Sequence, residues 1–558
     1  MNRVSIPDYG IIYNWDGNPL SYSEYPQSVG QLLEKVYAPI RDTQVGAHFW
    51  CVGEQEAKWP SQDLPITGDA VGRVYETVWN MRMAESIRAM FERGEDPYGD
   101  IVRHGHDLGV DVWASVRMND NHFWAVSSSD GEVTHRGKDP MWWWASRRKP
   151  LSVDEMTRTT ASYLTQERKD HPQWTLGDTA DPWAATSWNM AIPEVRELRL
   201  KLISEALRQA DWDGVELDWQ RHGFHLPTTD GFRLRYVLTD LQRAVRRLAD
   251  EMARARRRPF HVAVRVASTL ESCRRIGYDI ETWVNEGLCD LIIPGGNSGT
   301  DADIDMDGFR EILAGTQVKL YAGLDTDFRM RAKRLMPQAE WSDRWIRGEA
   351  AKLWDQGADG MYAFNWHANA ETKRGLLTTV GSPETLAGSS KVYAAVHGSH
   401  AAQGTLRHGA DRHDRIYAET PVTLYPTLTD ECPVFHLPFH DDLAGAIHPV
   451  IHPGTHPDIE LQIEIEHFSP TIDRVEVNVN GMDLGLPAVR NAAAEDPADP
   501  AMVSENSWLV WPLDPAQLSI GVQEVRVRLV ERDERLSVAL VIRHVEVHVA
   551  YSTDRLTA

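Results

Sequence analysis

The sequence is poor in cysteine and has no long apolar run. Its 558 residues include 4 cysteines, which are scattered and lack the paired spacing of zinc ligands or of a disulfide framework. No apolar segment approaches the roughly 20 residues needed to cross a bilayer. The opening residues, MNRVSIPDYG, lack the apolar stretch of a signal peptide. We therefore predict no membrane partner and a cytoplasmic location, or secretion if a leader has been removed.

Positive charge is also in short supply. The chain has 58 basic and 82 acidic residues, which give a net charge of −24. An acidic surface repels phosphate backbones, so we predict no nucleic-acid partner. No glycine-rich phosphate fingerprint follows the first predicted strand, and this disfavours an open, doubly wound sheet. We predict no cofactor.

Short apolar runs alternate with amphipathic helical stretches up to about residue 366. In the helical stretches, apolar residues recur every three or four positions. Strands that alternate with helices indicate an α/β fold with a parallel sheet and right-handed crossovers. Eight such units indicate a closed (β/α)8 barrel, or TIM barrel. The eight predicted strands are residues 10–15, 43–50, 109–118, 213–219, 261–266, 289–295, 318–324 and 358–364.

The pattern changes after the segment TTVGSPETLAGSSK, which is typical of a linker. Strict alternation of apolar and polar residues follows, with turn signals and no helical pattern, and this predicts an antiparallel β-sandwich. We expect the barrel to occupy residues 1–380 and the sandwich 390–558, with the boundary between about 378 and 395. Within the sandwich, the segment 490–501 is predicted to be an exposed, mobile loop. The predicted sandwich strands are residues 459–468, 474–484, 507–513, 522–531 and 540–551.

A long connection at about residues 120–190 follows the third predicted strand. Long loops in compact domains are usually functional, so we expect a lid or a binding wall. Its tandem Trp142, Trp143 and Trp144 are candidates to stack on sugar rings, or to pin the loop.

Active sites of such barrels form at the carboxyl ends of the strands. Polar and aromatic residues follow most of the predicted strands, a combination typical of a sugar-binding cleft. We therefore expect a carbohydrate substrate. The candidate substrate-binding residues are Asn14, Asp16, His48, Trp50, Arg117, Asn119, His122, Trp188, Arg221, His222, Arg265, Asn297, Asn365 and Trp366.

The fourth predicted strand, within DGVELDWQRH, carries acidic residues among apolar ones. Side chains alternate along a strand, so Glu216, Asp218 and Gln220 are expected on the inward face, with the first two Cα atoms about 6.6–7 Å apart. Two buried carboxylates at this range need partners, and we expect Arg117 or Arg265 to supply them. The alternative is a structural ion-pair layer in the barrel.

The motif DGVELDWQ resembles the strand-four signature of chitinase-type glycoside hydrolases, D-G-x-D-x-D-W-E, whose final Glu is the general acid. Here that position is Gln220 and the first inward Asp is Glu216. An amide cannot donate and recover a catalytic proton, so the chitinase mechanism does not carry over unchanged.

The chain more closely resembles a group of uncharacterised glycosyl-hydrolase-like barrels with the motifs RMND.H, PEVRE and DG.ELD..R. It has RMNDNH at 117–122, PEVRE at 193–197 and DGVELDWQR at 213–221. The resemblance covers roughly residues 10–370 and implies a barrel that acts on glycosidic bonds, often followed by a β-sandwich.

These patterns favour a glycoside hydrolase that uses paired carboxylates. Asp218 is the first candidate. Asp120 ranks above Asp325 as its partner, and Glu216 lies behind them. Three alternatives stay open: a carbohydrate-binding barrel without catalysis, suggested by Gln220; a lyase acting on an acidic sugar, since rim Arg and His suit a carboxylate; and a metal-dependent enzyme.

A metal-dependent enzyme would use histidines from HGH and HGFH or the third strand's end, namely His104, His106, His122, His222 and His225. His104 and His106 are two residues apart in a helical stretch and do not share a face. An H-x-x-x-H zinc signature is absent, so we predict no metal site. The oligomeric state stays open, a homo-oligomer included.

Overall fold

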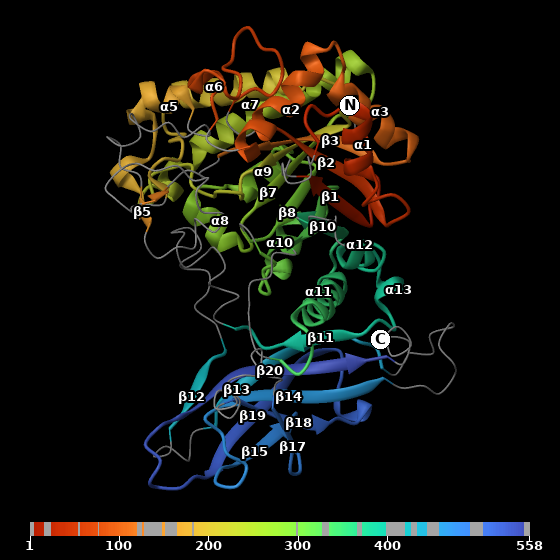
Figure 1. Cartoon of the computed structure of the whole chain (residues 1–558), viewed down its shortest axis with the longest axis vertical. Helices are drawn as coiled ribbons and strands as arrows, with labels where there is room; N and C mark the ends of the chain where they lie inside the picture. The colour runs from red at the N-terminus through yellow and green to blue at the C-terminus, as the bar shows by residue number, and fades with distance from the viewer. Residues whose placement is uncertain are drawn as a thin grey trace. The chain divides into compact units, whose positions relative to one another are not determined.

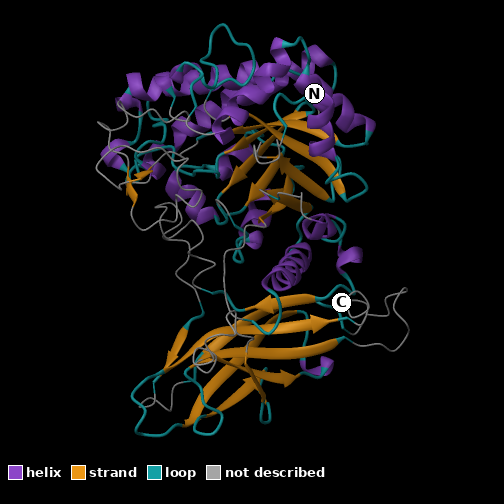
Figure 2. Ribbon diagram, viewed as in Figure 1, coloured by secondary structure: helices purple, strands orange, loops and turns teal. Residues whose placement is uncertain are grey.

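The computed structural model describes most of the chain in two compact units, one that contains a barrel and one that contains a sandwich (Figures 1 and 2). The described residues are 5–15, 24–53, 56–75, 78–119, 125–127, 148–150, 165–180, 184–296, 299–325, 334–364, 366, 371–397, 419–425, 432–443, 457–491 and 506–551.

Eight parallel strands form the closed barrel, and each pairs with its neighbours in chain order until β10 pairs with β1. All eight predicted strands are found, and the predicted TIM barrel is confirmed. The strands are β1 (Ile11–Trp15), β2 (Val45–Gly53), β3 (Asp111–Arg117), β6 (Gly214–Asp218), β7 (His261–Val266), β8 (Leu291–Pro294), β9 (Lys319–Asp325) and β10 (Gly360–Phe364).

The barrel interior is a packed core, not a pore. Aromatic and aliphatic side chains from several strands fill it, among them Phe49, Trp113, Ile293, Tyr321 and Tyr362. The outer faces of the strands are also buried, as in β6, where all five residues are inaccessible to solvent. Burial on both faces explains why these strands are near-continuous apolar runs in the sequence.

Helices connect the barrel strands, and their apolar residues face inward. In α7, Val237, Leu241 and Val245 recur at four-residue spacing and are buried, which is the pattern of an amphipathic helix. The helices of this unit are α1 (Val29–Tyr37), α2 (Val78–Glu92), α3 (Pro97–Asp107), α5 (Gln166–Asp170), α6 (Pro193–Ala206), α7 (Gly231–Arg256), α8 (Leu270–Ile276), α9 (Ile280–Asn285), α10 (Met306–Leu313) and α12 (Glu371–Leu377), with 3-10 turns η2 (Asp69–Val71), η5 (Pro172–Trp174) and η6 (Gly177–Thr179).

The predicted long connection after β3 contains a short antiparallel pair, β4 (Ala125–Ser127) with β5 (Arg148–Pro150), followed by α5. The tandem tryptophans 142–144 lie outside the described residues. Among the described helices, none combines the length and apolar character needed to cross a bilayer.

The second part of the chain contains two antiparallel sheets, and the predicted β-sandwich is confirmed. One sheet has β11 (Lys391–Ala394), β20 (Leu540–Ala550), β14 (Asp458–Glu466), β18 (Asn506–Pro512) and β17 (Ala488–Asn491) in that order, with β12 (Val422–Leu424) also paired to β20. The other has β13 (Val434–Phe439), β19 (Gly521–Glu531), β15 (Arg474–Val479) and β16 (Met482–Asp483). Their shared core includes Ile463, Val477, Leu509, Val527 and Val547.

Four sandwich strands, β11, β12, β13 and β17, were not predicted. Strands β11, β12 and β17 have three or four residues, too few to display a clear period of two. Strand β13 has six residues that alternate in burial, so in this case the signal was present in the sequence. Strand β17 also covers the first residues of the predicted mobile loop at 490–501, and the remainder of that loop lies outside the described residues.

Helix α11 (Gln338–Asp355) lies between β9 and β10 in the chain but belongs to the sandwich unit. There it packs against β11 and the short helix α13 (Pro383–Leu386). The sandwich unit also contains the 3-10 turn η9 (Pro515–Gln517).

Candidate active site

Asp218 is the last residue of β6 and is in register with Arg117 of β3 and Arg265 of β7. These three residues end or nearly end neighbouring strands, at the carboxyl end of the barrel where active sites form. All three are at most 4% exposed. The prediction that Asp218 points into the barrel near Arg265 is confirmed by their ion pair, 2.9 Å between Oδ1 and Nη1.

The two oxygens of Asp218 have different surroundings. Oδ1 accepts hydrogen bonds from Arg265 and from the backbone N–H groups of Gln220 and Arg221, the latter two at 3.1 and 2.9 Å. Oδ2 is buried and has no hydrogen-bond partner among the described residues. Asp218 is thus an ion-paired carboxylate with one oxygen held by the protein and one oxygen that has no hydrogen-bond partner among the described residues.

Arg265 is fixed from three sides. Besides Asp218, it donates from Nη2 to the Gly296 carbonyl at 2.5 Å, and its guanidinium lies 3.8 Å from the ring centroid of Phe364. Arg221 approaches the same ring at 5.6 Å. Phe364 therefore brings the end of β10 against the guanidinium that holds Asp218.

Glu216 lies two residues deeper in β6 and is fully buried. Asn14 of β1 donates to its Oε2 at 3.0 Å, and the Tyr362 hydroxyl of β10 donates to its Oε1. These partners are more than 140 residues away in sequence. They confirm that Glu216 points into the barrel and hold it in one position beneath Asp218.

Burial raises the pKa of Glu216 to about 7, and the negative charge of Asp218 contributes in the same direction. Hydrogen bonds from Ser115 and Tyr362 and the positive charge of Arg265 oppose this rise. Two carboxyl groups in one enclosed site resist simultaneous ionisation. Near neutral pH, the Glu216 carboxyl group below the Asp218 carboxylate is therefore about half protonated.

Asp325 is the last residue of β9 and the register partner of Phe364. It is buried, and its backbone N–H donates to the Thr300 hydroxyl at 2.7 Å while its carbonyl accepts from the same hydroxyl at 2.6 Å. Because Phe364 contacts Arg265, a chain of neighbours links Asp325 to Asp218 around the carboxyl end of the barrel.

Asn119 and Trp188 are occupied by internal contacts. The Asn119 amide nitrogen donates to the carbonyls of Trp188 and Phe224 at 3.1 and 2.6 Å, and its oxygen accepts from the Trp188 N–H at 3.0 Å. Trp188 is fully buried, with the Arg168 guanidinium 4.1 Å from its ring. This arrangement ties the long connection to the end of β3.

His48 and Trp50 face away from the barrel interior. They alternate with Ala47 and Phe49, which belong to the interior core. His48 contacts Tyr37 of α1 edge-on, and Trp50 stacks on Trp15. Burial lowers the pKa of His48 to about 3, which keeps the imidazole neutral. Both side chains therefore lie on the outer face of β2, away from Asp218.

The remaining candidates divide by where they lie. Asn14 supports Glu216 as described, while Arg221 and His222 follow β6 and are mostly buried. Trp366 is buried after β10, and its carbonyl accepts from the Tyr13 hydroxyl at 3.1 Å. Outside the described residues lie Asp16, Asp120, His122, Asn297 and Asn365.

Sequence reasoning missed Tyr362 and Phe364. Both lie in GMYAF, a predicted strand in which aromatic residues are expected as core, and both do line the interior. The available signal was the alternation of side chains along the strand, which places Tyr362 and Phe364 on one face; that face is the interior of the barrel.

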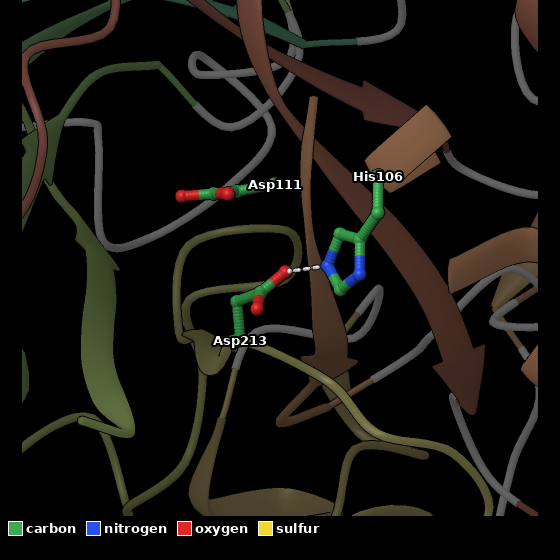
Figure 3. A group of neighbouring side chains, drawn as sticks. All are labelled: His106, Asp111 and Asp213. Carbon is green, nitrogen blue, oxygen red and sulfur yellow. Dashed lines mark hydrogen bonds and ion pairs between the residues drawn. The ribbon is translucent and has the colours of Figure 1, made fainter. Parts of the chain in front are cut away.

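Figure 3 shows a group of side chains with metal-ligand chemistry, His106, Asp111 and Asp213. Asp111 begins β3 and Asp213 directly precedes β6, so the group lies at the opposite end of these strands from Asp218. Asp213 accepts from the Val112 N–H and from Arg258, both at 2.7 Å, and contacts His106 Nε2 at 2.7 Å. Asp111 accepts from the Tyr9 hydroxyl. These contacts join α3 and the segment after α7 to the starts of β3 and β6, so the group has a structural role.

No protein-family model and no curated protein matches this chain. Among solved structures, an Anoxybacillus alpha-amylase is 11% identical over 98% of each chain, with a TM-score of 0.32. A Chromobacterium violaceum chitinase is 9% identical over 67% of this chain and 98% of its own, with a TM-score of 0.30.

A Paenibacillus cycloisomaltooligosaccharide glucanotransferase is 8% identical over 97% of this chain, with a TM-score of 0.31. This chain spans 58% of that protein's length. Similarity at this level identifies no family.

Proposed function

We propose that this chain is a glycoside hydrolase that cleaves O-glycosidic bonds at the carboxyl end of its barrel, with Asp218 as the principal carboxylate. The observation that carries the proposal is the unequal environment of its two oxygens. Arg265 and two backbone N–H groups hold Oδ1, while Oδ2 is buried without a hydrogen-bond partner among the described residues. The resemblance of DGVELDWQR to glycosyl-hydrolase-like barrels supports the same assignment.

The ion pair with Arg265 suits Asp218 to the role of nucleophile or general base, because either role requires the carboxylate form. The guanidinium fixes its orientation, so little reorganisation accompanies the reaction. Glu216, about half protonated near neutral pH and hydrogen-bonded to Asn14 and Tyr362, supports the site from below without adding a second full negative charge.

The general acid in this proposal comes from another strand. Gln220 occupies the position of the chitinase acid and cannot supply a proton. Asp325, at the end of β9 next to Phe364, and Asp120, in the motif after β3, are the two candidates. The separation of the two carboxyl groups in a substrate complex will determine whether the configuration is retained or inverted.

The test is Asp218→Asn, assayed by release of reducing ends from a panel of oligosaccharides of defined linkage. The amide keeps the shape but loses the charge, so turnover should fall by at least about 10²–10⁴-fold while KM changes little. Circular dichroism checks the fold, because removing one partner of a buried ion pair is strongly destabilising.

Asp213→Asn is the matched control. Asp213 lies five positions before Asp218, at the opposite end of the barrel, and forms an ion pair with Arg258. Its replacement breaks this ion pair and should leave turnover unchanged. Near-normal turnover in Asp218→Asn would refute the assignment. Sugar binding by the wild-type chain without product from any substrate would instead support a non-catalytic carbohydrate-binding barrel.

A further inference from the structure

A groove lies on the outside of the barrel between the start of α7 and the helices α8 and α9, which contact one another. Its volume is about 190 Å³, below the roughly 300–1,000 Å³ of pockets that enclose a whole ligand. Its lining includes Phe232, Arg235, Arg274, Tyr278, Asp279 and Glu281. The groove therefore has room for one small ring, with the remainder of a longer ligand outside it.

Two exposed aromatic rings lie at one wall of this groove. Phe232 and Tyr236 are 51% and 58% exposed and are four positions apart in α7, so they share one face of the helix. Phe232 lines the groove, and Tyr236 extends the same face beyond it. In the described part of the barrel unit, Tyr25 is the only other exposed phenylalanine, tyrosine or tryptophan. Singly scattered apolar residues are ordinary on a surface, whereas neighbouring ones indicate a binding surface.

The polar groups of the groove are held in place by ion pairs. Arg235 donates from Nε to Asp279 at 3.2 Å and from Nη1 to the Phe232 carbonyl at 2.9 Å. Its guanidinium lies 4.2 Å from the Phe232 ring centroid. Arg274 contacts Glu281 at 2.7 Å, and both side chains are more than half exposed. Two arginines and two carboxylates give the lining a net charge of zero and offer both donors and acceptors.

The groove is joined to the candidate active site through Tyr278. The hydroxyl of this buried residue donates to the Trp219 carbonyl at 2.6 Å, and Trp219 directly follows Asp218. Helices α7 and α8 also approach closely, because a Cβ atom at Gly231 would lie 2.3 Å from the Arg275 carbonyl oxygen. The groove therefore has a fixed position beside the chain segment that leaves the candidate site.

These features together fit a carbohydrate. The ring hydrogens of a pyranose form an apolar face that stacks on aromatic side chains, while its hydroxyls both donate and accept hydrogen bonds. A lining with paired charges and no net charge matches an uncharged sugar and does not attract a polyanion. The exposed charges of the groove also differ from the apolar, charge-depleted core of a protein–protein interface.

We propose that this groove, together with Tyr236, is a second carbohydrate-binding site, which holds an uncharged polysaccharide chain near the candidate active site. The proposal rests on the proposed function in one respect, namely that the bound chain is also the substrate cleaved at Asp218. Binding at a second site on the same unit raises the effective concentration of a polymer at the first site.

Native gel electrophoresis through gels that contain a soluble polysaccharide measures this binding directly, in the cold, where turnover is slow. The probes are glycogen, galactomannan and mixed-linkage β-glucan as uncharged chains, and alginate as an acidic chain. At least one uncharged polysaccharide should retard the wild-type chain. Phe232→Ala combined with Tyr236→Ala should weaken that binding about 5-fold or more, because both stacking surfaces are lost.

Tyr425→Ala is the matched control, because Tyr425 is 52% exposed and lies in the sandwich unit. This variant should bind like wild type. Arg274→Ala is a second groove variant, and it should also weaken binding; its side chain is 56% exposed, so loss of its ion pair costs little stability.

Wild-type binding in both groove variants would overturn the proposal. The same holds if alginate alone binds, or if none of the uncharged chains retards the wild-type protein. Sedimentation velocity tests the alternative of a protein partner: a wild-type oligomer that dissociates when Phe232 and Tyr236 are replaced would assign these rings to an interface between copies of the chain, and would overturn carbohydrate binding here.

Kinetics separate this proposal from the proposed function. The ratio of kcat/KM on the retained polysaccharide to kcat/KM on a short oligosaccharide of the same linkage should fall about 5-fold in the double variant. An unchanged ratio would refute the statement that the bound chain is the substrate. Absence of turnover in the wild-type chain would refute the proposed function, and the electrophoretic comparison would still decide whether the groove binds carbohydrate.

Discussion

Replacement of Glu216 by Gln should change how the stability of the barrel depends on pH. The carboxyl group is buried and its pKa rises from 4.5 to about 7, chiefly through burial and then through the charge of Asp218. The folded state therefore holds this proton more tightly than the unfolded chain does. The resulting stabilisation is fully present below pH 4.5 and is lost as the pH rises to about 7.

The size of this effect follows from the interval between the two pKa values. At about 1.4 kcal/mol per pH unit, the interval from 4.5 to about 7 corresponds to about 3 kcal/mol of unfolding free energy. The amide side chain of the Glu216→Gln variant has no titratable proton, so the variant lacks this loss. Relative to wild type, the variant should gain about 3 kcal/mol between about pH 4 and pH 8.

Urea unfolding at about pH 4, 6 and 8, followed by far-ultraviolet circular dichroism, measures the difference. Glu216→Gln disturbs the hydrogen bonds with Asn14 and Tyr362 at every pH, so the diagnostic quantity is the change of the difference with pH and not its value at one pH. A stability difference that is constant across this pH range would refute the assignment of a raised pKa to Glu216.

Two further predictions concern Tyr362 and Asn119. Tyr362→Phe removes a hydrogen bond that favours the charged form of Glu216, so the upper limit of the pH range over which the barrel loses stability should rise, as measured by the same unfolding series; an unchanged upper limit would contradict it. Asn119→Ala removes three hydrogen bonds to buried backbone groups of Trp188 and Phe224 and should lower the free energy of unfolding by about 3 kcal/mol; a thermal unfolding curve like that of wild type would show that Asn119 does not tie the long connection to β3.

The architecture could be predicted because it depends on local patterns. Each βα unit can be recognised within a short stretch of the chain, as an apolar run of strand length next to an amphipathic helix. Eight such units indicate a closed barrel. The same reasoning from period-two alternation located the long sandwich strands. The short strands β11, β12 and β17 were missed because they have too few residues to show a period, whereas β13 was missed although its six residues alternate in burial.

The candidate site could be predicted only in part. Asp218 and Arg265 follow from alternation and from the rule that chemistry occurs at the carboxyl ends of strands. His48 and Trp50 were assigned to the site because they lie at the end of the second predicted strand. β2 is buried on both faces, and such a strand gives no indication of which side is inside. Asn119 is polar in a motif and near the rim, yet its hydrogen bonds are used within the protein.

The sequence by itself determined the order and type of the elements and the side of β6 that carries Glu216 and Asp218, because these depend on spacing between near neighbours. Only the tertiary structure decided which oxygen of Asp218 accepts a hydrogen bond from Arg265 and that Asn14 and Tyr362 both donate to Glu216. It also decided that the indole of Trp341 in α11 donates to Glu546 of β20. Each of these contacts joins residues far apart in the chain or depends on which of two buried faces turns inward. Long-range contacts arise from barrel closure and from packing between layers, and neither leaves a periodic signal in the chain.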